Sequence, residues 1–201
     1  MVHALISPGD ASRIAAGVAR EFRDLTGRAP AVVTAAPGRV NLIGEHVDYN
    51  AGRCLPLAIP HATYAGVAAR TDGRLRVTSN HARDTWEGSL AGISAGSVDG
   101  WAAYVAGVFW ALGEAGWEVP GCDVVVEPRV PVGAGLSSSA ALECSVALAV
   151  AAVVGLEDTE SVRRTLVAAC IRAENEMAGA PTGGIDQTVA LLGQAGHALL
   201  I

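Results

Sequence analysis

The segment 37–52 concentrates side chains that could bind a polyol. It places Arg39, Glu45, His46 and Asp48 within ten positions, between glycines and beside a pair of apolar residues. Each sugar hydroxyl both donates and accepts hydrogen bonds, and carboxylates with an imidazole supply the complementary groups. A solvated polar loop would have a similar composition, but the tight grouping of Glu, His and Asp favours a sugar-binding segment.

A glycine- and serine-rich stretch at 131–142 is the second candidate. Its glycines would let the backbone approach a phosphate closely, and a following helix would offer unpaired N–H groups at the positive end of its dipole. Serine hydroxyls can bond phosphate or coordinate Mg²⁺. The same residues could simply turn the chain and cap a helix, so the stretch predicts either a phosphate loop or an ordinary helix start.

Three carboxylates lie in the third candidate segment, 173–187. Glu174 and Glu176 fall on opposite flanks of a helix's apolar stripe, so periodicity does not choose between them. Asp186 lies in the first turn of a short helix. An acidic residue there is favoured by the helix dipole, and a carboxylate in the same place could also act as a general base.

The basic residues restrict the possible phosphate chemistry, because all 14 are arginine and the sequence has no lysine. The Walker P-loop and the protein kinases both place a lysine on the ATP phosphates. Neither mechanism is available within these residues. The formal charge of −6 is opposite to the basic footprint of nucleic-acid-binding proteins, so we expect no nucleic-acid partner.

The three segments resemble motifs of the galactokinase family, within the superfamily of galactokinase, homoserine kinase, mevalonate kinase and phosphomevalonate kinase (the GHMP kinases). The match is close along the whole of segment 37–52. The resemblance implies ATP-dependent phosphorylation of galactose at its C1 hydroxyl, with Mg²⁺. It makes about 36–52 the galactose-recognition segment and about 131–142 the ATP loop.

The same resemblance assigns residues to the sugar site. Glu45 and His46 would hold the O6 side of galactose. Asp48 would hold the O3/O4 side and help to recognise the axial C4 hydroxyl. Val47 and Gly183 would complete the sugar-binding set.

Catalytic and nucleotide-binding roles also follow from the resemblance. Asp186 would accept the proton of the C1 hydroxyl, and Arg39 would stabilise charge beside it. Trp101 would flank the adenine, and Ser139 with Glu174 would hold Mg²⁺. The residues expected to form the ATP loop are Gly133, Ala134, Gly135, Leu136, Ser137, Ser138 and Ser139.

Hydrophobic spacing predicts the elements that must position these segments. Helices are expected at 12–26, 101–115, 138–154, 160–177 and from a turn at 181–184 through 192. Strands are expected at 31–34, 55–69, 74–78 and 122–127, with another beginning at 197–201, and connections at 35–52 and 88–100. Strands early and helices later predict an α+β fold.

The resemblance implies the corresponding domain, a GHMP-kinase N-terminal domain over 1–201. This domain is a mixed sheet with packed helices, similar to the second domain of ribosomal protein S5. The C-terminal GHMP domain would lie outside this sequence, and the full-length protein would be a monomer. Other interpretations stay open: an N-acetylgalactosamine kinase, another GHMP small-molecule kinase, or a non-catalytic sensor of galactose and ATP.

Cysteine usage and hydropathy bear on the compartment. The four cysteines form no CxxC pair, which argues against a zinc site and predicts reduced thiols in the cytoplasm. The first residues lack the pattern of a signal peptide. The most apolar run, 146–154, is shorter than the roughly 20 residues that span a bilayer, so we expect no membrane partner.

Overall fold

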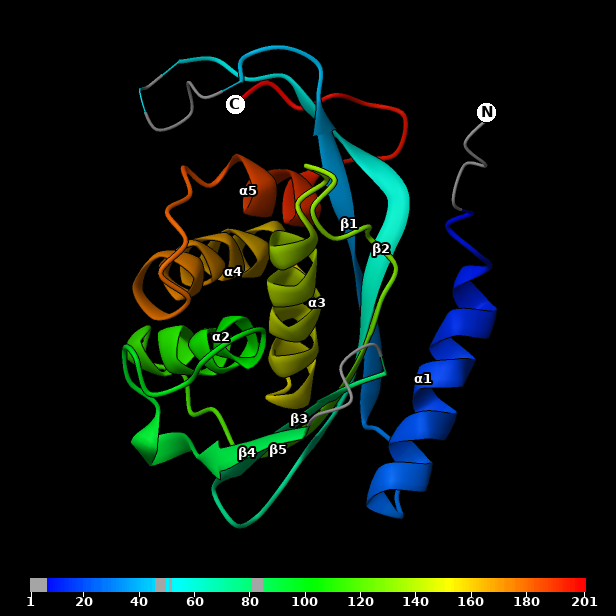
Figure 1. Ribbon diagram of the computed structural model, residues 1–201, viewed down its shortest axis with the longest axis vertical. Helices are drawn as coiled ribbons and strands as arrows, with labels where there is room; N and C mark the ends of the chain where they lie inside the picture. Colours follow the sequence, from blue (N-terminus) through cyan, green and yellow to red (C-terminus); the bar gives the residue numbers. More distant parts are fainter. Residues whose placement is uncertain (1–6, 46–49, 51, 81–84) are drawn as a thin grey trace.

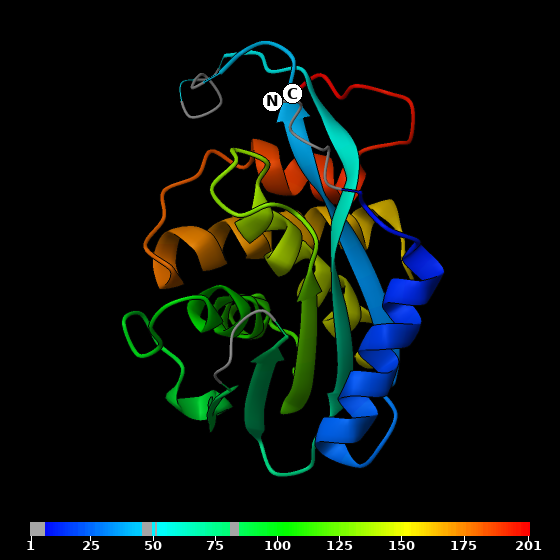
Figure 2. The same ribbon diagram turned by 45° about the vertical axis from the view of Figure 1, so that its right-hand side comes forward.

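A five-stranded sheet of order β1-β2-β5-β3-β4 lies at the centre of the structure, a computed structural model that describes residues 7–45, 50, 52–80 and 85–201. The strands are β1 (Val32–Asn41), β2 (Pro56–Ala69), β3 (Arg74–Ser79), β4 (Thr85–Ser89) and β5 (Cys122–Pro128). β3 and β5 run parallel, and the other neighbouring strands are antiparallel. Helix α1 covers one face of the sheet, and the remaining helices cover the other (Figures 1 and 2). The α+β prediction is confirmed.

Helix α1 (Ala11–Thr26) has clear start and stop signals. The carboxylate of Asp10 accepts a hydrogen bond from a backbone N–H of the first turn, and Gly27 ends the helix with a left-handed φ of 74°. The helix buries an apolar stripe against the sheet. Gly66 on β2 makes this close contact possible, because a Cβ there would lie 2.9 Å from Cγ1 of Val18.

Four helices form the layer on the other face: α2 (Ala102–Glu114), α3 (Ser138–Val153), α4 (Glu160–Arg172) and α5 (Ile185–Leu192). The central helix, α3, lies against β1 and β2 and contacts the other three helices. Small Ala and Val side chains let this helix pack on all sides. Within the described parts of the chain, no helix is both long enough and apolar enough to cross a membrane.

Three strand predictions were wrong or incomplete. β1 continues to Asn41, well beyond 34, because Arg39, Val40 and Asn41 pair with Ala58, Leu57 and Pro56 at the start of β2. β4 was not predicted, although its residues pair with β3 over five positions. Residues 197–201 form no strand, but Leu199 hydrogen-bonds to Pro56 at the start of β2, and Ile201 hydrogen-bonds to Cys54 just before it. Strand pairing is a long-range contact, which a local pattern does not contain.

The helix predicted over 160–177 is also divided. α4 ends at Arg172, and a π-helical turn, η3 (Ala173–Met177), follows it. The backbone N–H of Ala178 donates to the carbonyl of Ala173, five residues earlier. Such single π turns are frequent at functional sites, where they change the direction of side chains.

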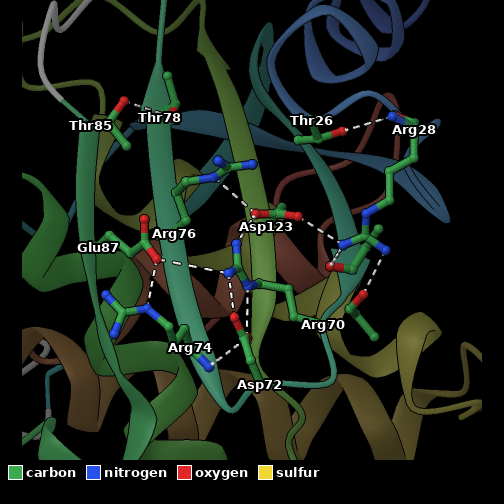
Figure 3. A network of polar contacts seen from close by, with 12 residues as sticks. Thr26, Arg28, Arg70, Asp72, Arg74, Arg76, Thr78, Thr85, Glu87 and Asp123 are labelled. Carbon is green, nitrogen blue, oxygen red and sulfur yellow. Dashed lines mark hydrogen bonds and ion pairs between the residues drawn. The ribbon is translucent and has the colours of Figure 1, made fainter.

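A charged network lies on the face of the sheet that α1 partly covers (Figure 3). At its centre is Asp123 on β5, which is only 4% exposed. Its carboxylate is 2.8 Å from Arg28, 2.7 Å from Arg70 and 3.0 Å from Arg76. Arg28 lies in the α1–β1 connection, Arg70 directly follows β2, and Arg76 lies on β3. One carboxylate therefore links three segments to β5.

Candidate active site

Arg39, on β1, joins two segments that are far apart in the sequence. Its Nε donates to Oδ1 of Asp186 at 2.7 Å, although the two residues are 147 positions apart. Its Nη1 donates to the carbonyl oxygen of Gly135 at 2.7 Å. The side chains of Arg39 and Asp186 are 16% and 18% exposed, so less water screens the ion pair than at the surface. The carboxylate of Asp186 is therefore held at the edge of the 133–139 loop.

The approach of the 133–139 loop to β1 depends on Gly38. The strand register shifts between Pro37 and Arg39, and the backbone N–H of Arg39 donates to the carbonyl of Leu136 at 3.1 Å. A Cβ at position 38 would lie 2.5 Å from this carbonyl oxygen and 2.8 Å from a methyl group of Val130. Only glycine leaves room for the loop at its observed position.

Replacing Gly38 with Ala is expected to displace the 133–139 loop. Overpacking of this kind costs about 1–3 kcal/mol, so the thermal midpoint of the chain falls. Gly17→Ala is the matched control, because a Cβ on that helical glycine has nothing within 4 Å. Differential scanning fluorimetry measures the two thermal midpoints. Equal midpoints in the two variants would contradict the role of Gly38.

The 133–139 loop has the backbone of a strained turn before a helix. Gly133 and Gly135 have φ values of 74° and 70°, and Ser137 has a φ of 57°, which is uncommon for a residue with a side chain. The Ser137 hydroxyl is buried and has no hydrogen-bond partner among the described residues. It also makes no side-chain cap on α3 within that part of the chain. The N–H groups at the start of α3 therefore receive no cap from the Ser137 side chain, and uncapped helix N-termini are favourable sites for anions.

A cavity of about 350 Å³ lies beside the start of α3. Ser138 and Ser139 form its polar end, and Ser79 lies on its lining. Its apolar walls are Trp101, Tyr104, Val126, Pro128, Val132 and Leu142. An apolar pocket with a few convergent polar groups is typical of small-molecule sites. A larger cavity of about 600 Å³ lies beneath α1, on the opposite face of the sheet from Asp186.

Glu174 lies inside the helical layer, where the π turn directs it. It is 6% exposed, and its Oε1 accepts a hydrogen bond from the Ser139 hydroxyl at 2.7 Å. Glu176 instead faces solvent and pairs with Arg172 at 2.8 Å. Periodicity left these two glutamates equivalent, and the structure separates them. Burial raises the pKa of Glu174, and the hydrogen bond from Ser139 opposes that change.

Two further buried side chains, Gln187 and Glu143, extend the contact between Ser139 and Glu174, and the sequence did not single them out. Nε2 of Gln187 donates to Oε2 of Glu174 and, at 3.3 Å, to Oε2 of Glu143. Burial raises the pKa of Glu143 well above its usual value, and no Arg lies among the described hydrogen-bond and ion-pair contacts of its carboxyl group. A polar residue in the apolar repeat of α3 is the one signal that could have identified Glu143.

Ser139 and Glu174 could hold a divalent cation. Their oxygen atoms are 2.7 Å apart at the start of α3, and Mg²⁺ binds oxygen ligands. Among the described residues, no cluster of three or more His, Cys, Asp or Glu could hold a metal. This donor set fits an ion that is bound by one or two protein oxygens together with substrate phosphates.

The turn before α5 fixes the position of Asp186. Asn175 accepts a hydrogen bond from the N–H of Thr182 at 2.7 Å, which ties the turn to η3. Gly184 starts the helix with a φ of 94°, and a Cβ there would lie 2.4 Å from Cδ1 of Ile171. Gly183, which the resemblance assigns to the sugar site, directly precedes Gly184 and is exposed. Asp186 is therefore held in the first turn of α5.

The sugar-recognition segment is only partly described. Glu45 is exposed after the end of β1, whereas His46, Val47 and Asp48 lie outside the described residues. The backbones of Leu42 and Leu55 are hydrogen-bonded at 3.0 Å, so the two arms of the β1–β2 connection stay paired beyond Asn41. This connection lies at the same end of the sheet as α5 (Figure 1).

Comparisons with known proteins agree with these motifs. Residues 20–69 match the model of the galactokinase galactose-binding signature, and residues 103–194 match the model of the GHMP kinase N-terminal domain. A galactokinase of Streptomyces coelicolor is 48% identical over 191 residues, which cover 94% of this chain and 48% of that protein. The chain spans about half the length of the curated relatives it matches.

Solved structures of GHMP kinases are also similar to this chain. The Lactococcus lactis galactokinase complexed with galactose matches 94% of this chain and 49% of its own, with a TM-score of 0.83 and 29% identity. The Methanococcus jannaschii mevalonate kinase matches 85% of this chain and 53% of its own, with a TM-score of 0.67 and 18% identity, and so shows a shared fold. With its GHMP-kinase N-terminal fold, its two family signatures and these relatives, the chain belongs to the galactokinase family.

Proposed function

We propose that this chain is the N-terminal part of a galactokinase, which transfers the γ-phosphate of ATP to the C1 hydroxyl of galactose. The contact network of Arg39 carries this proposal. One guanidinium bonds the carboxylate of Asp186 and the backbone of the 133–139 loop, each at 2.7 Å. Arg39 thereby places the base for the acceptor hydroxyl next to the loop for the donor phosphates.

Asp186 accepts the proton of the C1 hydroxyl as the sugar oxygen attacks phosphorus. Phosphoryl transfer involves little covalent chemistry by the protein, so positioning and electrostatics account for most of the rate. Arg39 fixes the direction of the Asp186 carboxylate and offers positive charge to the transferring phosphoryl group. Its hydrogen bond to Gly135 keeps that charge beside the phosphate loop.

The nucleotide occupies the 350 Å³ cavity and the adjacent loop in this proposal. Trp101 and Tyr104 provide an apolar wall for the adenine, and the N–H groups at the start of α3 bind phosphate oxygens. Ser139 and Glu174 would hold Mg²⁺, which would supply positive charge to neutralise the phosphate oxygens.

The experiment joins this chain to the C-terminal half of the Streptomyces coelicolor relative and assays the chimera beside the 201-residue chain. ADP release is measured with galactose, N-acetylgalactosamine, mevalonate and homoserine. Release with galactose alone supports the proposal. Release with N-acetylgalactosamine instead would identify a kinase for the 2-acetamido sugar, and binding of galactose and ATP without ADP release would identify a sensor.

Replacing Asp48 with Ala in the chimera is expected to raise the KM for galactose at least about tenfold, because a hydrogen bond to a charged group contributes about 1.5–3 kcal/mol. Steady-state kinetics over a galactose series checks this. Replacement of Asp24, which is exposed on α1, with Ala is the control. An unchanged KM in the Asp48 variant would show that this segment does not hold the sugar.

A C-terminal GHMP domain forms the other wall of the cleft, and the full-length protein acts as a monomer in the cytoplasm. The four cysteines are buried and none forms a disulfide in the part of the chain described here, which supports a reducing compartment.

A further inference from the structure

A buried chain of three polar side chains lies behind the contact between Ser139 and Glu174. It connects η3, α5 and α3 through Glu174, Gln187 and Glu143, and the last two are 0% exposed. We propose that Gln187, oriented by Glu143, is a positioning residue that keeps the Glu174 carboxylate turned toward Ser139 and the metal. This inference rests on the proposed role of Glu174 as a metal ligand.

The orientation of the Gln187 amide determines whether its contact with Glu174 is attractive or repulsive. A glutamine amide has a donor end and an acceptor end. With the donor end inward, Nε2 bonds Oε2 of Glu174, which leaves Oε1 to face the Ser139 hydroxyl. With the amide rotated by half a turn, its oxygen would face a carboxylate oxygen, and the two would repel.

Glu143 selects the donor orientation. Its Oε2 lies 3.3 Å from Nε2 of Gln187 and accepts the second amide hydrogen. Both hydrogens of the amide are thus used by two carboxyl groups on different elements. Without an acceptor on α3, only Glu174 itself would hold the amide in this orientation.

This arrangement is poorly explained by stability alone. Oε1 of Glu143 and Oε1 of Gln187 are buried and have no hydrogen-bond partner among the residues that the structure describes. A partly satisfied buried polar chain is less stable than an apolar core, and apolar residues of similar volume often replace buried charged groups without loss. Sites that break a rule of core composition without a gain in stability are expected to serve function.

The first measurement titrates MgCl₂ into the 201-residue chain with ATP and follows the thermal midpoint. Gln187→Met removes the donor at similar length, and Glu143→Met removes the acceptor. Both are expected to need about 10–100-fold more Mg²⁺ for half of the metal-dependent shift, the usual effect of losing a partner of a metal ligand. Their response to ATP without Mg²⁺ should equal that of the wild type.

Two variants serve as matched controls. Glu143→Gln keeps an acceptor oxygen for the amide, and Glu176→Gln changes an exposed carboxylate on the same π turn. Both should respond to Mg²⁺ as the wild type does. The midpoint of Glu143→Met without ligand should equal or exceed that of the wild type. A wild-type Mg²⁺ response in Gln187→Met, or a large fall in the unliganded midpoint of Glu143→Met with no change in its Mg²⁺ response, would overturn the proposal.

Crystal structures of the same variants separate this inference from the proposed function. The Ser139–Glu174 contact should be lost in Glu143→Met and kept in Glu143→Gln. If the wild type shows no Mg²⁺-dependent shift, the metal role of Glu174 fails, while these structures still decide the positioning role. Should Gln187→Met not fold, the two Glu143 variants alone give the answer, because a kept contact in Glu143→Met contradicts the proposal.

Discussion

Replacing Asp186 with Asn should lower kcat of the chimera at least about 10²–10⁴-fold, the usual contribution of a general base. Asparagine keeps the shape of the side chain and an oxygen that accepts from Nε of Arg39, so the ion-pair geometry survives as a hydrogen bond. What is lost is the ability to take a proton. Rapid-quench and steady-state assays measure kcat, and isothermal titration with galactose should give an affinity close to that of the unmodified chimera.

Asp24→Asn is the control for this variant, because it makes the same chemical change at an exposed position on α1. Its kcat should match that of the unmodified chimera. A near-normal kcat in Asp186→Asn would remove the role of Asp186 as the base. A large rise in KM with little change in kcat would instead show that Asp186 binds the sugar.

The second large effect concerns stability and involves Asp123. Replacing it with Ala leaves Arg28, Arg70 and Arg76 without their shared carboxylate (Figure 3). Breaking a buried ion pair costs about 3–5 kcal/mol. The arginines reach partly into solvent, so we expect the lower end, about 3 kcal/mol, and a midpoint lower by about 6–12 °C for a chain of this size.

Asp72→Ala is the matched control, since Asp72 belongs to the same network but is exposed and pairs with Arg70 at the surface. Exposed ion pairs contribute about 0–1 kcal/mol. Urea unfolding of the 201-residue chain at pH 7 compares the two variants. Equal losses of unfolding free energy would show that Asp123 is no more important than a surface carboxylate.

The contribution of Asp123 also depends on pH. Burial raises the pKa of Asp123, but the hydrogen bonds from Arg28 and Arg70 and the charges of Arg76 and Arg70 together outweigh it, so the pKa lies below its usual value. A lowered pKa in the folded state stabilises the protein above the unfolded pKa of about 3.9, and that stability is lost as the pH falls through the folded value. The difference between wild type and Asp123→Ala in urea unfolding should therefore shrink below about pH 4.

Local signals in the sequence were sufficient to locate most of the helices and the three candidate segments, but not the π turn that follows α4. Helix α1 has its own cap at Asp10 and its own stop at Gly27, so its bounds follow from neighbouring residues. The 133–139 loop likewise carries its glycines within a few positions. Strand pairings were harder, because β1 is lengthened and β4 is formed by partners that lie elsewhere in the chain.

Sequence patterns alone were enough to identify the family, to locate the three segments and to supply the residue types that the proposed chemistry needs. Only the tertiary structure brought Arg39, Gly135 and Asp186 within hydrogen-bond distance, because sheet pairing and helix packing act between distant positions. It also buried Glu174 and left Glu176 exposed, since a π turn changes which side chain faces inward. The buried chain through Gln187 and Glu143 exists only where α3, η3 and α5 meet.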